Sequence, residues 1–152
     1  RALIDSLVAA AGAGVEVTLL VRGPCTLRPG IPGVTDGITV RMIIDRFLEH
    51  SRVFYFDTDG EPSVFITSTD VMHRNFDRRI EVMLPIEDER IARRIVDEIL
   101  ALELADDTKA AVLEEDGTYR RLEGGSCRAQ ARFMALARQR AESATAGPRR
   151  AP

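Results

Sequence analysis

The feature that most constrains the fold is a near-continuous apolar run over residues 15–21, followed at once by a loop rich in proline and glycine. The run contains β-branched residues and is typical of a strand buried on both faces. Before it, residues 2–12 repeat apolar side chains every three to four positions, which predicts an amphipathic helix. In α/β proteins, ligands often bind in a loop that follows a buried strand. The pattern therefore predicts an α/β fold with a possible ligand site in this loop.

Strand and helix patterns alternate along the remaining chain, without an internal repeat or a linker. One expected helix ends near His50 and carries Ile43, Ile44, Phe47 and Leu48 on one side; by spacing, His50 faces inward with them. The other expected elements are strands at 38–40, 53–56, 63–67, 80–84 and 109–113, a turn at Asp59-Gly60, a helix capped by Asp88 with Ile91, Ile95, Ile99 and Leu102 buried, and a helix at 126–142.

Composition limits the class of protein. The chain has 152 residues, of which 45% are hydrophobic and 30% charged, enough for one globular domain with a core. No apolar run approaches the roughly 18 residues that span a bilayer. Its net charge of −3 disfavours nucleic-acid binding, because proteins that bind phosphate backbones usually have a basic surface. Cys25 and Cys127 are too far apart for a compact metal or disulfide motif, which suggests a reducing compartment, the cytoplasm.

One short pattern carries phosphoryl chemistry. His50, Arg52 and Asp57 fit H-x-[K/R]-x4-D, and Thr67-Ser68-Thr69-Asp70 follows ten residues later. This arrangement is similar to half of the phospholipase-D-type motif, in which H-x-K-x4-D precedes G-S-x-N. An imidazole can attack phosphorus or move a proton, an adjacent cation holds the oxygens, and hydroxyl and carboxyl groups orient both. The pattern indicates a phosphoryl-transfer site.

Four separated blocks extend this resemblance over residues 2–142. They are LLVRGPCTLRPGIPG at 19–33, RFLEHSRVFYF at 46–56, STDVMHRNFDRRIEV at 68–82 and DDTKA at 106–110. The chain resembles the C-terminal, phospholipase-D-like domain of bacterial polyphosphate kinase of the histidine-phosphorylated type. The resemblance implies a single α/β domain with a mixed sheet flanked by helices over residues 1–142. Residues 143–152 are expected to form a disordered basic tail.

The resemblance also implies the activity and its residues. Members of this family reversibly transfer the terminal phosphate of ATP to polyphosphate through a phosphohistidine. Arg22 and His50 match nucleotide-contacting residues of the family, so Arg22 is expected to bind phosphate oxygens and His50 to act catalytically at the transferring group. The possible secondary residues are Arg52, Ser68, Asp70 and Arg74, with Arg78 and Arg79 as further arginines that would line a basic tunnel for the polyanion. Val71 stands where the family usually has tryptophan.

Further expectations follow from the same resemblance. The phosphohistidine and the Mg²⁺ ligands are expected upstream of this chain, which begins with Arg1 inside a helical pattern and is interpreted as a fragment. No metal site is expected on the chain itself, and the isolated fragment is expected to be inactive. The expected partners are ATP or ADP and inorganic polyphosphate, without nucleic acid or a membrane span. A homo-oligomer is expected for the full-length protein.

Two other functions remain open from the residues. The first is a homodimeric phospholipase-D-type phosphodiesterase or nuclease that pairs two half-motifs. The second is a non-catalytic polyanion-binding module. Metal-independent cleavage of a phosphodiester would favour the first, whereas binding of polyphosphate without phosphohistidine formation would favour the second.

Overall fold

The computed structural model describes residues 2–146. It shows a mixed α/β fold, as the sequence predicts, but the strands form two sheets in place of the one that we expected. The chain divides into two compact units. The first is built from residues up to Leu48 and from Leu102 onward, and the second is Glu49–Ala101.

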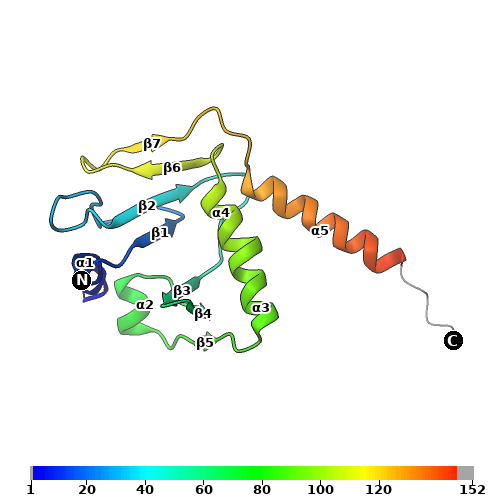
Figure 1. Ribbon diagram of the computed structural model, residues 1–152, viewed down its shortest axis with the longest axis horizontal. Helices are drawn as coiled ribbons and strands as arrows, with labels where there is room; N and C mark the ends of the chain where they lie inside the picture. Colours follow the sequence, from blue (N-terminus) through cyan, green and yellow to red (C-terminus); the bar gives the residue numbers. More distant parts are fainter. Residues whose placement is uncertain (1, 147–152) are drawn as a thin grey trace. The chain divides into compact units, whose positions relative to one another are not determined.

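The first unit is organised around a four-stranded mixed sheet. Its elements are α1 (Ala2–Gly12), β1 (Val17–Val21), β2 (Ile38–Ile43), β6 (Ala110–Leu113), β7 (Tyr119–Arg121) and α5 (Ala129–Ala146). The strand order is β1-β2-β6-β7, as Figure 1 shows. β1 and β2 run parallel, whereas β6 pairs antiparallel with both β2 and β7. The expected helix at 2–12 and strand near 15–21 are both confirmed.

The core of the first unit lies on this sheet and against α1. Its buried side chains come from β2, β6 and the loop after β1, where Leu27 is 4% exposed. Ile4 and Leu7 on the inner side of α1 pack against this cluster, as their helical spacing predicts. The buried cluster consists of Leu27, Ile38, Val40 and Leu113.

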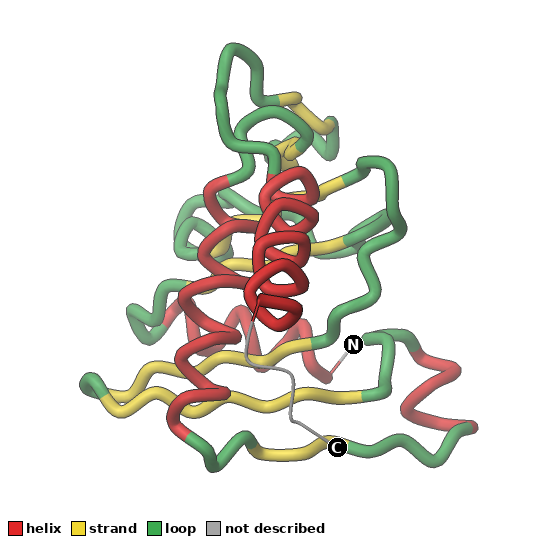
Figure 2. The backbone as a smooth tube through the Cα atoms, turned by 90° about the vertical axis from the view of Figure 1, so that its right-hand side faces the viewer, coloured by secondary structure: helices red, strands yellow, loops and turns green. Residues whose placement is uncertain are grey.

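The second unit contains a three-stranded antiparallel sheet. Its strands are β3 (Val53–Thr58), β4 (Glu61–Thr67) and β5 (Met83–Pro85), in that order, with the short helix α2 (His73–Arg78) between β4 and β5. Figure 2 draws these strands in yellow and α2 in red. β3 and β4 form the expected hairpin, in which Asp59 and Gly60 have φ angles of 54° and 85°. Such positive φ angles favour glycine and suit a tight hairpin turn.

A helical segment follows β5 and ends in the first unit. It comprises α3 (Glu89–Arg94), the π-helical turn η1 (Ile95–Leu100) and α4 (Ala101–Ala105). Asp88 caps α3, because its carboxylate accepts hydrogen bonds from the backbone N–H groups of Arg90 and Ile91. The cap predicted from the sequence is therefore confirmed. The expected buried stripe is only partly present, since Ile95 is buried but Ile91 is exposed.

The prediction of a helix that ends near His50 was wrong. β2 continues to Ile43, and residues 44–52 form neither helix nor strand. Pairing of β2 with β1 on one side and β6 on the other keeps this backbone extended, and Ile44, Phe47 and Leu48 are exposed.

Two other boundaries differ from the prediction, and one strand was not predicted. β5 begins at Met83, after the expected start at residue 80, and Ile80 is fully exposed. β7 was not predicted. α5 continues to Ala146, past residue 142 where the disordered tail was expected to begin, and the remaining part of that expected tail, 147–152, lies outside the described residues.

Candidate functional site

His50 lies at the start of the second unit, two residues before Arg52 and three before β3. Its side chain is exposed, in contrast to the inward position that helical spacing predicted. Because no helix forms here, the spacing to Phe47 and Ile43 places no constraint on where the imidazole points. His50 is therefore not a core histidine, and its ring is accessible to a ligand.

The Arg52 guanidinium holds the His50 imidazole in place. Its Nη1 lies 3.2 Å from Nδ1 of His50 and also donates to the His50 carbonyl oxygen at 3.2 Å. Its Nε donates to Oδ1 of Asp70 at 2.9 Å, and the two side chains of this ion pair are only 18% and 25% exposed. Arg52 thus bridges His50 and Asp70, and the structure brings together three residues that the sequence selected.

Arg52 also determines which nitrogen of the His50 ring can carry a proton in the neutral state. An arginine side chain has donors but no acceptor, so Nδ1 of His50 must accept this hydrogen bond. The proton of the neutral imidazole then sits on Nε2, on the opposite side of the ring. Nε2–H can donate a hydrogen bond to an anionic oxygen, such as that of a phosphate group.

Ser68 joins a second set of contacts on the same unit. Its hydroxyl hydrogen-bonds Oε2 of Glu81 and accepts from the backbone N–H of Val82 at 3.1 Å. Oε1 of Glu81 accepts from Nδ2 of Asn75 at 3.0 Å, and Asn75 is only 2% exposed. These contacts fix the 68–70 turn that presents Asp70 to Arg52. Sequence reasoning missed Glu81 and Asn75, although both fall inside the 68–82 block.

Other sequence candidates lie outside this network. Asp57 fits H-x-[K/R]-x4-D, but its Oδ1 accepts from the backbone N–H of Gly60 at 3.0 Å and belongs to the hairpin turn. The carboxylate that pairs with Arg52 is that of Asp70. Arg74 lies on α2 with an exposed side chain. Arg78 and Arg79, at the end of the same helix, are exposed as well.

Arg22 lies in the first unit, directly after the carboxyl end of β1. Its side chain is half-buried. Val21 pairs in parallel register with Met42, so Arg22 and the 44–48 segment leave the sheet at the same edge. The loop after Arg22 is held by Thr35, whose hydroxyl donates to the Arg28 carbonyl at 2.7 Å. This edge is where parallel strands commonly place ligand-binding loops.

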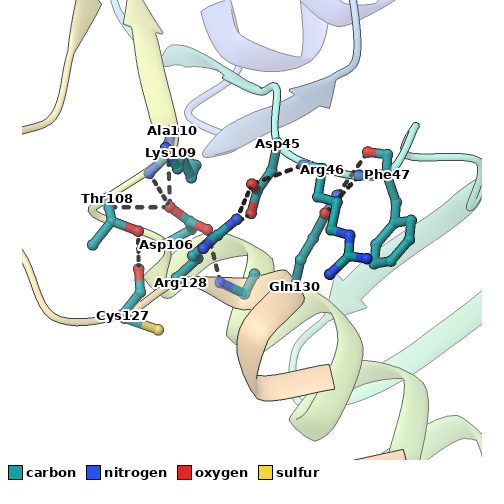
Figure 3. A network of polar contacts seen from close by, with 11 residues as sticks. Asp45, Arg46, Phe47, Asp106, Thr108, Lys109, Ala110, Cys127, Arg128 and Gln130 are labelled. Atoms are coloured by element: carbon teal, nitrogen blue, oxygen red, sulfur yellow. Dashed lines mark hydrogen bonds and ion pairs between the residues drawn. The ribbon is translucent and has the colours of Figure 1, made fainter. Parts of the chain in front are cut away.

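The 45–47 segment of the first unit is tied to the start of α5 (Figure 3). Arg128 binds Asp45 through two hydrogen bonds of 2.8 and 2.6 Å, and the Asp45 side chain is 3% exposed. Gln130 accepts from the Phe47 N–H at 2.9 Å and donates to the Phe47 carbonyl at 2.8 Å. The hydrogen bond from Arg128 lowers the pKa of the Asp45 carboxyl, and the charge of Lys109 contributes in the same direction. The chain leading toward His50 is therefore anchored three residues before it.

Asp106 organises the same region of the first unit (Figure 3). It is fully buried, and its Oδ1 accepts from the backbone N–H groups of Thr108, Lys109 and Ala110 at 2.7–3.1 Å. Its Oδ2 accepts from the backbone N–H of Ala129 at 2.8 Å, at the start of α5. Asp106 thereby connects the residues before β6 to α5.

Within residues 2–146, no group of three or more histidine, cysteine, aspartate or glutamate side chains is arranged to hold a metal ion. In the same part of the chain, the helices are too short or too polar to span a bilayer. The candidate site on the second unit consists of the exposed His50 imidazole and the Arg52 guanidinium that contacts it.

Comparisons with known proteins agree on one family. The family model described as polyphosphate kinase C-terminal domain 2 matches residues 1–133. The chain is 44% identical over 136 residues to a polyphosphate kinase of Burkholderia ambifaria strain MC40-6, covering 90% of this chain and 20% of that protein. It is 47% identical over 128 residues to a polyphosphate kinase of Vibrio cholerae, covering 84% of this chain and 18% of that protein.

A solved structure agrees with these relatives. The crystal structure of polyphosphate kinase from Porphyromonas gingivalis matches with a TM-score of 0.86 and 36% sequence identity, over 94% of this chain and 22% of that chain. The present chain thus spans about a fifth of the length of the curated relatives that it matches.

Proposed function

The chain belongs to the polyphosphate kinase family, and on that premise we propose that it forms part of an enzyme that reversibly transfers the terminal phosphate of ATP to inorganic polyphosphate. In this proposal, the phosphohistidine of the reaction lies outside the 152 residues. The domain contributes nucleotide- and phosphate-binding groups, of which Arg22 and His50 are the principal ones.

The observation that carries the proposal is the orientation of His50. Its ring is exposed, its Nδ1 accepts from Arg52, and Arg52 is fixed by Asp70. Nε2–H then donates to an oxygen of the transferring phosphoryl group or of the leaving phosphate. Negative charge on these oxygens is stabilised best by donors that are already oriented before the reaction. Arg52 and Asp70 are positioning residues in this scheme.

Arg22 acts as a fork for phosphate oxygens. A guanidinium can bind two oxygens of one phosphate at once, which a single ammonium cannot do with the same geometry. Its place after the carboxyl end of β1 suits a ligand-binding role.

The remaining parts of the proposal concern the longer protein. When bound, Mg²⁺ would neutralise negative charge on the phosphate oxygens, and in this proposal its ligands lie outside the 152 residues. The longer protein is phosphorylated on histidine, binds ATP or ADP, forms a homo-oligomer and resides in the cytoplasm. The isolated domain does not turn over.

A chimera tests the proposal without the longer parent chain. Residues 1–133 replace the matching segment of the Vibrio cholerae polyphosphate kinase, and polyphosphate synthesis from labelled ATP is measured. We expect His50→Ala in the chimera to lower turnover by about 10²–10⁴, the usual range for loss of a group that donates a proton or hydrogen bond in catalysis.

His73→Ala is the matched control, because His73 is the other histidine of the chain, is exposed on α2 and pairs with Asp77. It should change turnover less than about twofold. If His50→Ala retains turnover within about threefold of the unmodified chimera, His50 has no role in the reaction. An unmodified chimera that folds and binds polyphosphate but makes none would favour a non-catalytic binding module.

A further inference from the structure

A hollow lies on the sheet of the first unit, at the end of β2. Its volume is about 350 Å³, and its lining comes from the end of β2, from residues 108–111 and from β7. The charged residues of the lining are Lys109, Arg121 and Asp45, and Ala111 also lines the hollow.

The strand register explains why this face is hollow. Ala111 pairs with Met42 on one side and with Arg121 on the other, so these three residues form one row across the same face of the sheet. The middle position of that row is a methyl group between two long side chains. All three residues of this row line the hollow.

The charges of the hollow favour an anion. Arg121 and Lys109 are both exposed, and within the described part of the chain neither has an ion-pair partner within 4 Å. The one carboxylate of the lining, Asp45, is neutralised by its two hydrogen bonds from Arg128. Lys109, whose charge also acts on Asp45, and Arg121 thus lie beside a concave surface without a bonded carboxylate among the described residues.

Comparison with Arg120 shows that the lack of an ion-pair partner is specific to the arginine that lines the hollow. It is the neighbour of Arg121 in β7 and therefore points to the opposite face of the sheet. Its Nε donates to Oε1 of Glu114 at 2.6 Å, so its charge is compensated. Adjacent arginines of one strand thus differ in both the face that they occupy and the partner that they have.

We propose that the hollow bounded by Lys109 and Arg121, whose lining includes neither His50 nor Arg22, is a binding subsite for a chain of phosphate groups. An arginine fork and a lysine point charge together suit the oxygens of successive phosphates. The assignment of these phosphates to polyphosphate rests on the proposed function. The subsite holds the polyanion by charge and contributes to its affinity without taking part in the chemistry.

Binding to the 152-residue chain tests the subsite without any turnover. Titration calorimetry with tripolyphosphate, medium-length polyphosphate and ATP compares the unmodified chain with Lys109→Gln, Arg121→Gln and the double variant. For tripolyphosphate and polyphosphate, we expect each single change to weaken binding about three- to fivefold and the double change about tenfold. Losing one cation–phosphate contact should also reduce the slope of log affinity against log salt by about 0.7.

Arg120→Gln is the control, since it removes the same charge from the same strand on the opposite face. It should change affinity less than about twofold. Equal losses from Arg120→Gln and Arg121→Gln would show a general effect of net charge and overturn the subsite, as would unchanged binding in the double variant. A loss confined to ATP would also overturn it, because the site would then recognise the nucleoside.

The two proposals fail separately. The His50 experiment measures turnover in a chimera, whereas this one measures binding to the chain alone. Suppose that His50→Ala lowers turnover as expected, but the Lys109 and Arg121 variants bind polyphosphate unchanged. The proposed function would then stand, and only the subsite would be overturned.

Discussion

The two units hold their polar side chains in opposite ways. In the first unit, the Asp106 carboxylate is fully buried and its partners are backbone N–H groups from residues 108–110 and 129. In the second unit, the Arg52–Asp70 pair is partly exposed and its neighbour is the exposed imidazole of His50. The first arrangement is closed to solvent, and the second ends at a group that a ligand can reach.

The difference separates polar residues that stabilise from polar residues that position. A buried acceptor with all of its donors inside the protein contributes to folding, because each donor would otherwise lose its partner away from water. A series of contacting side chains that ends in an exposed donor contributes less to the stability of the fold, but it fixes the direction of that donor. Substitutions in the two units should therefore affect different measurements.

The largest effect is expected in the first unit. Asp106→Ala leaves four backbone N–H groups without their acceptor, which should lower the free energy of unfolding by at least about 4 kcal/mol. Asp106→Asn is the matched control, because its amide oxygen can keep the three contacts of Oδ1, and it should cost about half as much. Urea unfolding measures both variants.

Hydrogen exchange shows which unit the change affects. The Val17 and Leu122 amides, bonded to the Gly37 and Ala110 carbonyls, report the first unit, and the Thr67 and Ile86 amides, bonded to the Arg52 and Val64 carbonyls, report the second. Asp106→Ala should accelerate exchange mainly at the first pair. Equal acceleration at both pairs would show that the units unfold together and would break the comparison.

The next effect is expected on activity in the second unit. Arg52→Ala in the chimera should lower turnover by up to about 100-fold, because the His50 ring loses its orientation. The free energy of unfolding should fall by only about 1 kcal/mol, the scale of a partly exposed ion pair. Steady-state kinetics should place most of the loss in kcat and a smaller part in a raised KM for ATP, since the His50 contact strengthens as charge develops on the phosphate oxygens.

Arg52→Lys distinguishes orientation from charge. Lysine keeps the positive charge but cannot bind Asp70 and His50 with one planar fork, so turnover should remain low. Full recovery in this variant would mean that Arg52 supplies charge alone. A loss of stability as large as that of Asp106→Ala would instead make Arg52 a structural residue.

The smallest expected effect is a pH dependence of the first unit. The Asp45 carboxyl has a pKa below its ordinary value because Arg128 hydrogen-bonds it in the folded state. A lowered folded-state pKa stabilises the protein above the unfolded value of about 4 and loses that contribution as the pH falls through the folded value. The difference in urea midpoint between the unmodified chain and Arg128→Gln should therefore shrink between about pH 6 and pH 3. A difference that stays constant would show that the pair contributes through packing alone.

Local sequence signals predicted the elements that local interactions determine. Asp59-Gly60 indicated the β3–β4 hairpin because the backbone of a two-residue turn requires positive φ angles, and Asp88 indicated the start of α3 through its side-chain cap. Both features depend on residues within a few positions of each other. The helix α1 followed from its periodicity in the same way.

Long-range contacts decided the places where prediction failed. Residues 43–48 have the spacing of an amphipathic helix, but β6, about 70 residues later, pairs with β2, and Arg128 binds Asp45 across 83 positions. No pattern within the segment reports these partners. His50, Arg52 and Asp70 could be selected from a motif, whereas the contacts of Glu81 with Ser68 and Asn75 depend on how β4, α2 and β5 fold together.

The sheet of the first unit is interrupted in the sequence by the whole second unit, and this has a consequence for synthesis. A chain growing on the ribosome has β1 and β2 by Ile43, but the antiparallel partner of β2 begins only at Ala110. The β3, β4 and β5 pairings, by contrast, are complete in sequence by Pro85. The edge of β2 that pairs with β6 therefore stays unpaired while more than sixty further codons are translated. Closing a loop of that length is a slow step in folding.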